Sequence, residues 1–138
     1  MIEYPLSDWE TRRLAALYNL EILDTAPETD FENIVALAAQ LSGWPIATIG
    51  FIDYQRTWIK AAIGLETREV PTHPEYREAI LKSPHAVIIE DAALDPRSAN
   101  HPFVLHKPKV RGLAIFPLTT EDGYTLGHVT VADTKAGA

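Results

Sequence analysis

The spacing of apolar residues predicts a first helix near the start of the chain. Ser7 and Glu10 have the spacing of a capping box, in which the hydroxyl accepts a backbone N–H and the glutamate reaches back to the cap. The residues that follow repeat at helical spacing, and we expect the helix to end before Asp24. Its apolar stripe consists of Leu14, Leu17 and Tyr18.

A second helix is predicted from about Thr29 to Ser42. Gly43 follows it and suits a helix end, because glycine readily adopts the left-handed conformation that ends many helices. The predicted apolar face consists of Phe31, Ile34, Val35, Ala38 and Leu41.

After Pro45 the pattern changes from helices to strands. Residues 46–52 are apolar at both odd and even positions, which is typical of a central strand covered on both faces. Residues 57–63 return as a second strand after a polar tip, so these two runs predict a hairpin. Two further strands, 112–118 and 124–131, are joined by a turn that contains Asp122-Gly123.

The middle of the chain predicts shorter elements. Thr72 and Glu75 have the spacing of another capping box and would open a short helix that ends near Lys82. A short strand is expected at 85–89, and a proline-containing loop at 91–109. The elements together predict one α+β domain, with a central antiparallel sheet of about five to six strands and helices packed on it.

Charge and composition exclude several classes of function. Nineteen acidic and twelve basic side chains give a formal net charge of -7, and no basic run is present, which argues against a nucleic-acid binder. The longest uncharged apolar stretch is too short to span a bilayer, and the N-terminus lacks the features of a secretory signal. We therefore expect a cytoplasmic protein with no nucleic-acid or membrane partner.

The chain contains no cysteine. This rules out disulfides, thiolate metal sites, thiol nucleophiles and thioether attachment of a chromophore. Phosphate-binding glycine loops, a nucleophile elbow and zinc-protease motifs do not occur in the sequence either. From these observations we expect no catalytic residues and no enzymatic activity.

Several short motifs, in order along nearly the whole chain, resemble bacterial GAF domains. The front half is carried by Pro45-Ile46-Ala47, Asp53-x-x-Arg56-x-Trp58 and the run from Ile63 to Glu69. The middle loop is carried by Asp91-Ala92-x-x-Asp95-Pro96-Arg97 with Pro102 after it. The closing strands are carried by Arg111, Pro117-Leu118, Asp122-Gly123-x-x-Leu126-Gly127 and Ala132-Asp133.

The resemblance implies a PAS-related architecture, with a lead-in helix in residues 1–26 and a GAF core in 27–138. It also implies a ligand-sized cavity between the sheet and the loops on one side. Such domains sense small molecules or act as dimerisation and relay modules, and they usually precede a kinase, cyclase or transcriptional effector. We therefore expect a fragment of a longer bacterial signalling protein. The motifs do not name a cofactor or ligand, because the usual Ser-Phe-Cys-like motif is replaced here by Pro74, Glu75 and Tyr76.

The candidate ligand-binding residues are predicted from their position around that implied cavity. Each also has a structural interpretation: Trp58 suits core packing, His73 suits the entry of the short helix, and Arg111 suits a loop contact with Asp91 or Asp95 rather than an anionic ligand. His73 could alternatively be an axial haem ligand, and His101 and His106 are interpreted as surface residues of a loop rather than a metal pair. The full candidate set is Phe51, Trp58, His73, Tyr76, Arg77, Ile80, Asp91 and Arg111, with no metal site.

Two functions remain open. The first is a sensory domain that binds a small molecule noncovalently and relays a conformational signal to an effector domain, as a homodimer formed through the first helix. The alternative is a ligand-free dimerisation or docking module. In that case the space would be filled by Phe51, Ile80, Leu113 and Phe116.

Overall fold

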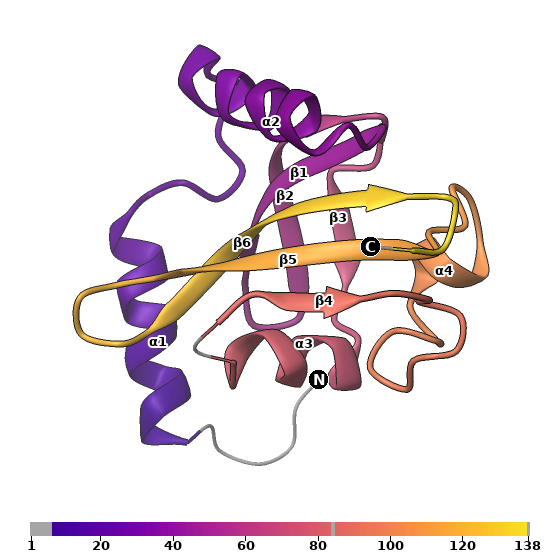
Figure 1. Cartoon of the computed structure of the whole chain (residues 1–138). Coiled ribbons are helices and arrows are strands. Elements are labelled where there is room, and N and C mark those ends of the chain that lie inside the picture. Colours follow the sequence, from indigo (N-terminus) through magenta and orange to yellow (C-terminus); the bar gives the residue numbers. More distant parts are fainter. Residues whose placement is uncertain (1–6, 84, 138) are drawn as a thin grey trace.

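A computed structural model describes residues 7–83 and 85–137 of the chain. It contains one antiparallel sheet of six strands in the order β3-β2-β1-β6-β5-β4, with helices on both faces (Figure 1). The predicted α+β class is therefore confirmed. The strands are β1 (Ile46–Ile52), β2 (Arg56–Ile63), β3 (Glu69–Pro71), β4 (Val87–Ile89), β5 (Gly112–Thr119) and β6 (Thr125–Asp133). The helices are α1 (Asp8–Asn19), α2 (Thr29–Ser42), α3 (Pro74–Leu81) and α4 (Pro102–Leu105).

The strand β1 lies at the centre of the sheet because both of its faces are apolar. All seven of its residues are buried, as the sequence predicted. It pairs with β2 on one side and with β6 on the other, and a bulge at Ile49/Gly50 interrupts the register with β2. The sheet therefore separates two hydrophobic cores, one beneath α1 and α2 and one beneath α3 and α4.

Close backbone contact between β1 and β6 depends on Gly127. A Cβ atom built at this position would lie 2.1 Å from the carbonyl oxygen of Gly50, a distance that real Cβ atoms do not show. The register pairs Phe51 with Gly127, so the contact occurs inside the ladder and not at its end. A glycine is required here by the approach of the two strands.

The first helix buries its apolar stripe against the sheet, whereas a homodimer formed through this helix would require the stripe to be exposed. Leu14 and Leu17 are buried inside the chain with Val35 of α2 and the sheet residues around them. Tyr18 is 49% exposed, and its hydroxyl donates to Asp53 at 2.7 Å. The expectation that Leu14 and Leu17 need cover from a second copy is wrong, because the sheet already covers them.

The helix α2 has the predicted bounds and the predicted end at Gly43, whose φ is 73°. Its orientation about its own axis differs from the prediction. Val35 is fully buried, whereas Ile34 and Leu41 are exposed. The period of 3.6 residues allowed either side of the stripe to face the sheet, and packing against β1 and β2 selected the side of Val35.

The two predicted capping boxes have different outcomes. Ser7 caps α1 and accepts the N–H of Glu10 at 3.1 Å, but the Glu10 side chain bonds arginines and does not reach back to the cap. The box predicted from Thr72 and Glu75 does not form. The N-cap of α3 is His73, which makes no side-chain cap bond, and Pro74 opens the helix.

Two short elements were not predicted. The strand β3 adds an edge to β2, and its proline is tolerated because an edge strand has one unpaired side. The helix α4 lies in the loop predicted for 91–109 and opens with Pro102, a residue favoured in the first turn. Within the described residues, no helix is both long and apolar enough to cross a membrane.

Candidate functional site

A small cavity of about 70 Å³ lies between the sheet and the segment that carries α3 and α4. Its floor is formed by directly paired positions of β1 and β6: Ile46 with Ala132, and Thr48 with Thr130. Gly50 pairs with His128 in the next step of the same ladder. Residues Thr57 and Ile59 of β2 and Leu113 of β5 extend the floor to both sides.

The opposite wall comes from the helices and the loops around them. Tyr76 contributes from α3, Phe103 and Val104 from α4, and His101 from the N-cap of α4. The ring of His101 lies 4.5 Å from that of Tyr76 and 5.3 Å from that of Phe103, measured between centroids. The remaining lining residues are Leu65, Val70, Pro108 and Val110.

His128 is the most buried of the polar residues that line the cavity. It is 5% exposed, and burial lowers the pKa of its imidazole to about 4, so the ring is neutral near pH 7. Its Nδ1 lies 2.7 Å from the hydroxyl of Thr130, and its Nε2 is buried with no hydrogen-bond partner within the described residues. A buried polar atom without a partner is rare in folded proteins and marks this ring as a place for a ligand or a water.

His101 is held in one neutral form by the start of α4. Its Nδ1 accepts the N–H of Phe103 at 3.1 Å, so the proton of the neutral ring lies on Nε2. Burial lowers the pKa of His101 to about 4, and the nearby His73 and His128 add to this effect. Burial also raises the pKa of the Tyr76 phenol. The three rings are therefore uncharged near pH 7.

The structure places one predicted ligand-binding residue, Tyr76, in the wall of the cavity. Phe51 lies in the opposite core, with α1 and α2, and is 5% exposed. Trp58 is also on that side, close to Lys60, which agrees with its structural interpretation. Ile80 packs in the core around the cavity but does not line it. The prediction that Phe51 and Trp58 bind a ligand in this cavity is therefore wrong, because both side chains lie on the other face of the sheet.

The loop candidates have structural contacts. Arg111 donates to the carbonyls of Val104 and Val110 and so fastens the loop, but it does not pair with Asp91 or Asp95 as the sequence suggested. Asp91 accepts the N–H of Ala93 at 3.1 Å, and Asp95 pairs with Arg97.

His73 lies next to the cavity and outside its wall. Its ring centroid is 6.0 Å from that of His101, and its Nε2 is 3.6 Å from the carboxylate of Glu75, too far for a hydrogen bond. Among the described residues, no group of three or more His, Asp or Glu has the geometry to hold a metal ion.

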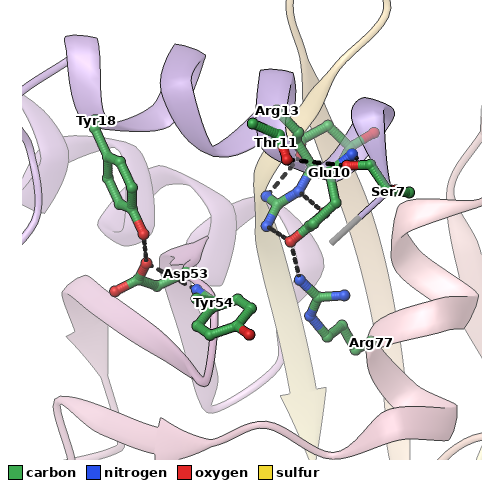
Figure 2. Close-up of polar contacts among 9 residues, drawn as sticks. Ser7, Glu10, Thr11, Arg13, Tyr18, Asp53, Tyr54 and Arg77 are labelled. Atoms are coloured by element: carbon green, nitrogen blue, oxygen red, sulfur yellow. Dashed lines mark hydrogen bonds and ion pairs between the residues drawn. The ribbon is translucent and has the colours of Figure 1, made fainter. Parts of the chain in front are cut away.

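Arg77 belongs to a different cluster, which joins α3 to α1 (Figure 2). Glu10 of α1 accepts Nε and Nη2 of Arg13 at 2.7 and 2.9 Å, and it accepts Nη2 of Arg77 at 2.5 Å. Arg13 is fully buried and also donates to the carbonyl of Thr125 at 3.1 Å. Burial raises the pKa of Glu10, but the bonds and charges of the two arginines outweigh it and hold the pKa below its usual value.

Sequence reasoning missed the residues that define the cavity, His128 above all. A signal was present, since His128 and Thr130 alternate with apolar residues in a buried strand and so point to the same face. His101 was interpreted as a surface residue because α4 was not predicted. Most of the rest of the wall is apolar and does not differ in sequence from ordinary core.

Solved structures that resemble this chain share one fold. Residues of this chain align over 94% of its length with a solved GAF domain from a phosphoenolpyruvate-protein phosphotransferase of Coxiella burnetii, with a TM-score of 0.63, 13% identity and 81% of that chain covered. GAF domains occur repeatedly among the matching structures. The chain has the GAF fold. A family model that matches the sequence was not found.

A curated relative has a higher sequence identity with this chain. It is a cyclic di-GMP phosphodiesterase of Pseudomonas aeruginosa, 34% identical over 129 residues, which is 94% of this chain and 22% of the relative. The chain thus spans about a fifth of the length of that protein. Together with the GAF structures, this similarity supports a sensory or regulatory domain in general terms.

The expectation that the chain has no enzymatic activity is contradicted. The curated relative is a phosphodiesterase, and a free methionine-R-sulfoxide reductase of Thermoplasma acidophilum aligns over 95% of this chain and 81% of its own chain, with a TM-score of 0.61 and 10% identity. The absence of cysteine excluded thiol chemistry alone. It did not justify excluding enzymes as a class.

Proposed function

We propose that this GAF domain is a sensor that holds a small molecule noncovalently in the cavity between the sheet and α3/α4. The observation that carries the proposal is the buried Nε2 of His128, which has no partner within the described residues and belongs to a ring that lines the cavity. A ligand with a matching hydrogen-bonding group would satisfy this atom and avoid the cost of leaving it unpaired.

The route of the signal runs through α3. Tyr76 contacts the cavity, and the next residue, Arg77, bonds Glu10 of α1. A ligand that favours one position of α3 would therefore shift the balance of positions available to α1, since both helices are joined by a partly buried ion pair. In this proposal, α1 carries the change in the cavity towards the rest of the protein.

The effector of this signal is proposed from the curated relative. We expect a phosphodiesterase-type effector domain in the same polypeptide, in place of the kinase or cyclase type expected from the sequence, because the chain matches about a fifth (22%) of a cyclic di-GMP phosphodiesterase. The cytoplasmic location expected from the sequence is part of the same proposal.

The ligand-free module is the second candidate function. It is favoured by the cavity volume, about 70 Å³, which is below the few hundred Å³ of a typical ligand site. Only two of the four residues expected to fill the space, Ile80 and Leu113, lie in the core around the cavity. Phe51 lies on the other face of the sheet, and Phe116 is 46% exposed, so neither fills it.

A homodimer stays a prediction, but it would need another surface. Leu17 of α1 is fully buried inside the monomer, so a substitution there would disturb the core and would not report on a dimer. The exposed apolar residues of α2 are Ile34, Leu37 and Leu41, at 42%, 55% and 78% exposed. Light scattering on wild type and Leu37→Glu tests a dimer through this face, and an unchanged monomeric mass for both would remove it.

A thermal-shift screen tests the sensor proposal. Wild type, Ala132→Val and Ala62→Val would be screened with cyclic nucleotides, haem, biliverdin and a panel of neutral metabolites. Ala132 lines the cavity, whereas Ala62 is a half-exposed position of β2 and serves as the matched control. We expect a compound that raises the melting temperature of wild type and Ala62→Val but not of Ala132→Val. If no compound does so, the ligand-free module is the better account.

A further inference from the structure

The wall of the cavity carries no formal charge near neutral pH. Its polar side chains are those of three threonines, one tyrosine and two histidines, and none of its described residues is Asp, Glu, Lys or Arg. The two histidines are neutral in the folded protein because burial lowers the pKa of both. An ion placed here would lose its hydration and gain no opposite charge, which is strongly unfavourable.

Two arginines that are adjacent in sequence to wall residues bind other groups. Arg77 follows Tyr76 but binds Glu10 on α1. Arg111 follows Val110 but donates to two backbone carbonyls of its own loop. Neither guanidinium is among the residues that line the cavity, so neither compensates an anion there.

One fully buried hydrogen-bonding atom of the lining side chains has no partner among the described residues. The Nδ1 of His128 is engaged with Thr130 at 2.7 Å, and the Nε2 is buried without a partner among the described residues. Gly50, which pairs with His128 in the sheet, has no side chain to cover the ring, and a Cβ there would lie 3.9 Å from Cε1 of His128. The structure thus offers one fully buried, neutral hydrogen-bonding atom in a wall that is mostly apolar.

The size of the space limits the ligand further. A dry cavity of about 150 Å³ is known to hold benzene, and the present one is about 70 Å³. Cyclic nucleotides, haem and bilins are both charged and much larger than this space.

We propose that the ligand of this cavity is a small uncharged molecule, apolar over most of its surface, whose one hydrogen-bonding group pairs with Nε2 of His128. This inference rests on the proposed sensor function and specifies its ligand class. It also identifies His128 as the residue that pairs with the ligand, while the uncharged wall as a whole sets the preference for neutral over charged molecules.

Three probes with four heavy atoms each separate charge from size: 1-propanol, propylammonium and acetate. Each would be titrated into the ¹⁵N-labelled chain at pH 7, with the imidazole ¹⁵N signals of His128 and the exposed His106 followed by NMR. We expect 1-propanol to shift the His128 signals with a dissociation constant in the millimolar range, as suits so small a molecule. Both ions should bind about tenfold more weakly or not at all, and His106 should not respond.

Two variants test the role of His128 itself. His128→Phe keeps a flat ring without the hydrogen bond, and His128→Gln keeps a polar group if the first variant fails to fold. With backbone amides of the cavity residues as the readout, we expect His128→Phe to weaken 1-propanol about three- to tenfold. His106→Phe is the matched control and should leave binding unchanged.

The outcomes separate this inference from the proposed function. Binding of 1-propanol alone supports both. Binding of acetate or propylammonium at the cavity as tight as that of 1-propanol overturns the neutral-ligand inference and leaves the sensor function standing. Binding of 1-propanol that is unaffected by both His128 variants overturns the role of His128. No response to any probe overturns the neutral-ligand inference, and the sensor function is then decided by the thermal-shift screen alone.

Discussion

Arg77 on α3 donates a hydrogen bond to the carboxylate of Glu10 on α1, 67 positions earlier in the chain (Figure 2). The two side chains are 17% and 10% exposed, so the pair is largely removed from water. Because the same carboxylate holds the buried Arg13, one acidic side chain fixes the position of α1 relative to both β6 and α3. The helix next to the cavity is thereby linked to the helix at the edge of the domain.

A double-mutant cycle measures the strength of this link. Arg77→Met removes one donor of the cluster, and Glu10→Gln removes its negative charge. We expect Arg77→Met to lower the free energy of unfolding by about 1 to 3 kcal/mol, the range for hydrogen bonds to charged groups. The coupling energy in urea denaturation should be about 1 kcal/mol or more. Arg12→Met, at an exposed position of α1, is the control and should change stability little. Additive effects of the two substitutions would remove the proposed link.

The two neutral histidines predict a loss of stability in mild acid. The pKa of His128 is about 4 in the folded chain, against an ordinary value of 6.5 when the chain is unfolded, so the unfolded chain binds a proton that the folded chain does not. Stability from this group is full above about pH 6.5 and decreases as the pH falls towards 4, by at most about 1.4 kcal/mol per pH unit. Below pH 4 the slope levels off.

Chemical denaturation of wild type and His128→Gln from pH 7.5 to 4.5 checks this slope. The glutamine cannot take up the proton, so its stability should fall less steeply over the same range. The contribution of His101, whose pKa is lowered in the same direction, remains in both proteins. Parallel pH profiles for the two proteins would show that His128 titrates normally and is not held neutral by the fold.

The single methyl group added by Gly127→Ala is expected to push the paired strands β1 and β6 apart. Gly127→Ala places a Cβ against the carbonyl of Gly50 and so requires the two central strands to move apart. We expect a loss of more than about 2 kcal/mol, similar to a severe core substitution. Gly123→Ala is the matched comparison: its φ of 92° is unfavourable for alanine, but no atom lies within 4 Å, so its cost should be about 1 to 2 kcal/mol. Circular dichroism during thermal unfolding compares the two, and equal losses would contradict the close-approach explanation.

Much of the fold could be predicted from the sequence because its strongest patterns are local. The run from Ile46 to Ile52 is apolar on both faces, and it is the central strand. The cap at Ser7 and the end at Gly43 were found because capping needs particular residue types. The buried face of α2 was not predicted correctly, because the pattern of its apolar residues fits more than one orientation. The contacts with β1 and β2 decide between these orientations.

The candidate site was harder to predict because its residues come together from separate elements spread along most of the chain. Tyr76 was placed correctly by its position on the short helix. Phe51 was placed on the wrong face of the sheet, because a strand that is apolar on both faces does not show which parity faces the ligand. The burial of Arg13 was missed for another reason: its ion pair with Glu10 is local to α1, but the carbonyl of Thr125 that it also binds comes from β6.

A molecule bound in the cavity is expected to change the dynamics of α1, and hydrogen exchange tests this relay without assuming an effector. The compound with the largest effect in the thermal-shift screen, or 1-propanol, would be added to wild type and to Arg77→Met. Amide exchange would then be followed in α1 (8–19) and α3 (74–81). We expect the ligand to slow exchange in both helices of wild type and in α3 alone of Arg77→Met. Slower exchange in α3 with no change in α1 of the wild type would contradict the relay, and no change in either helix would contradict the sensor.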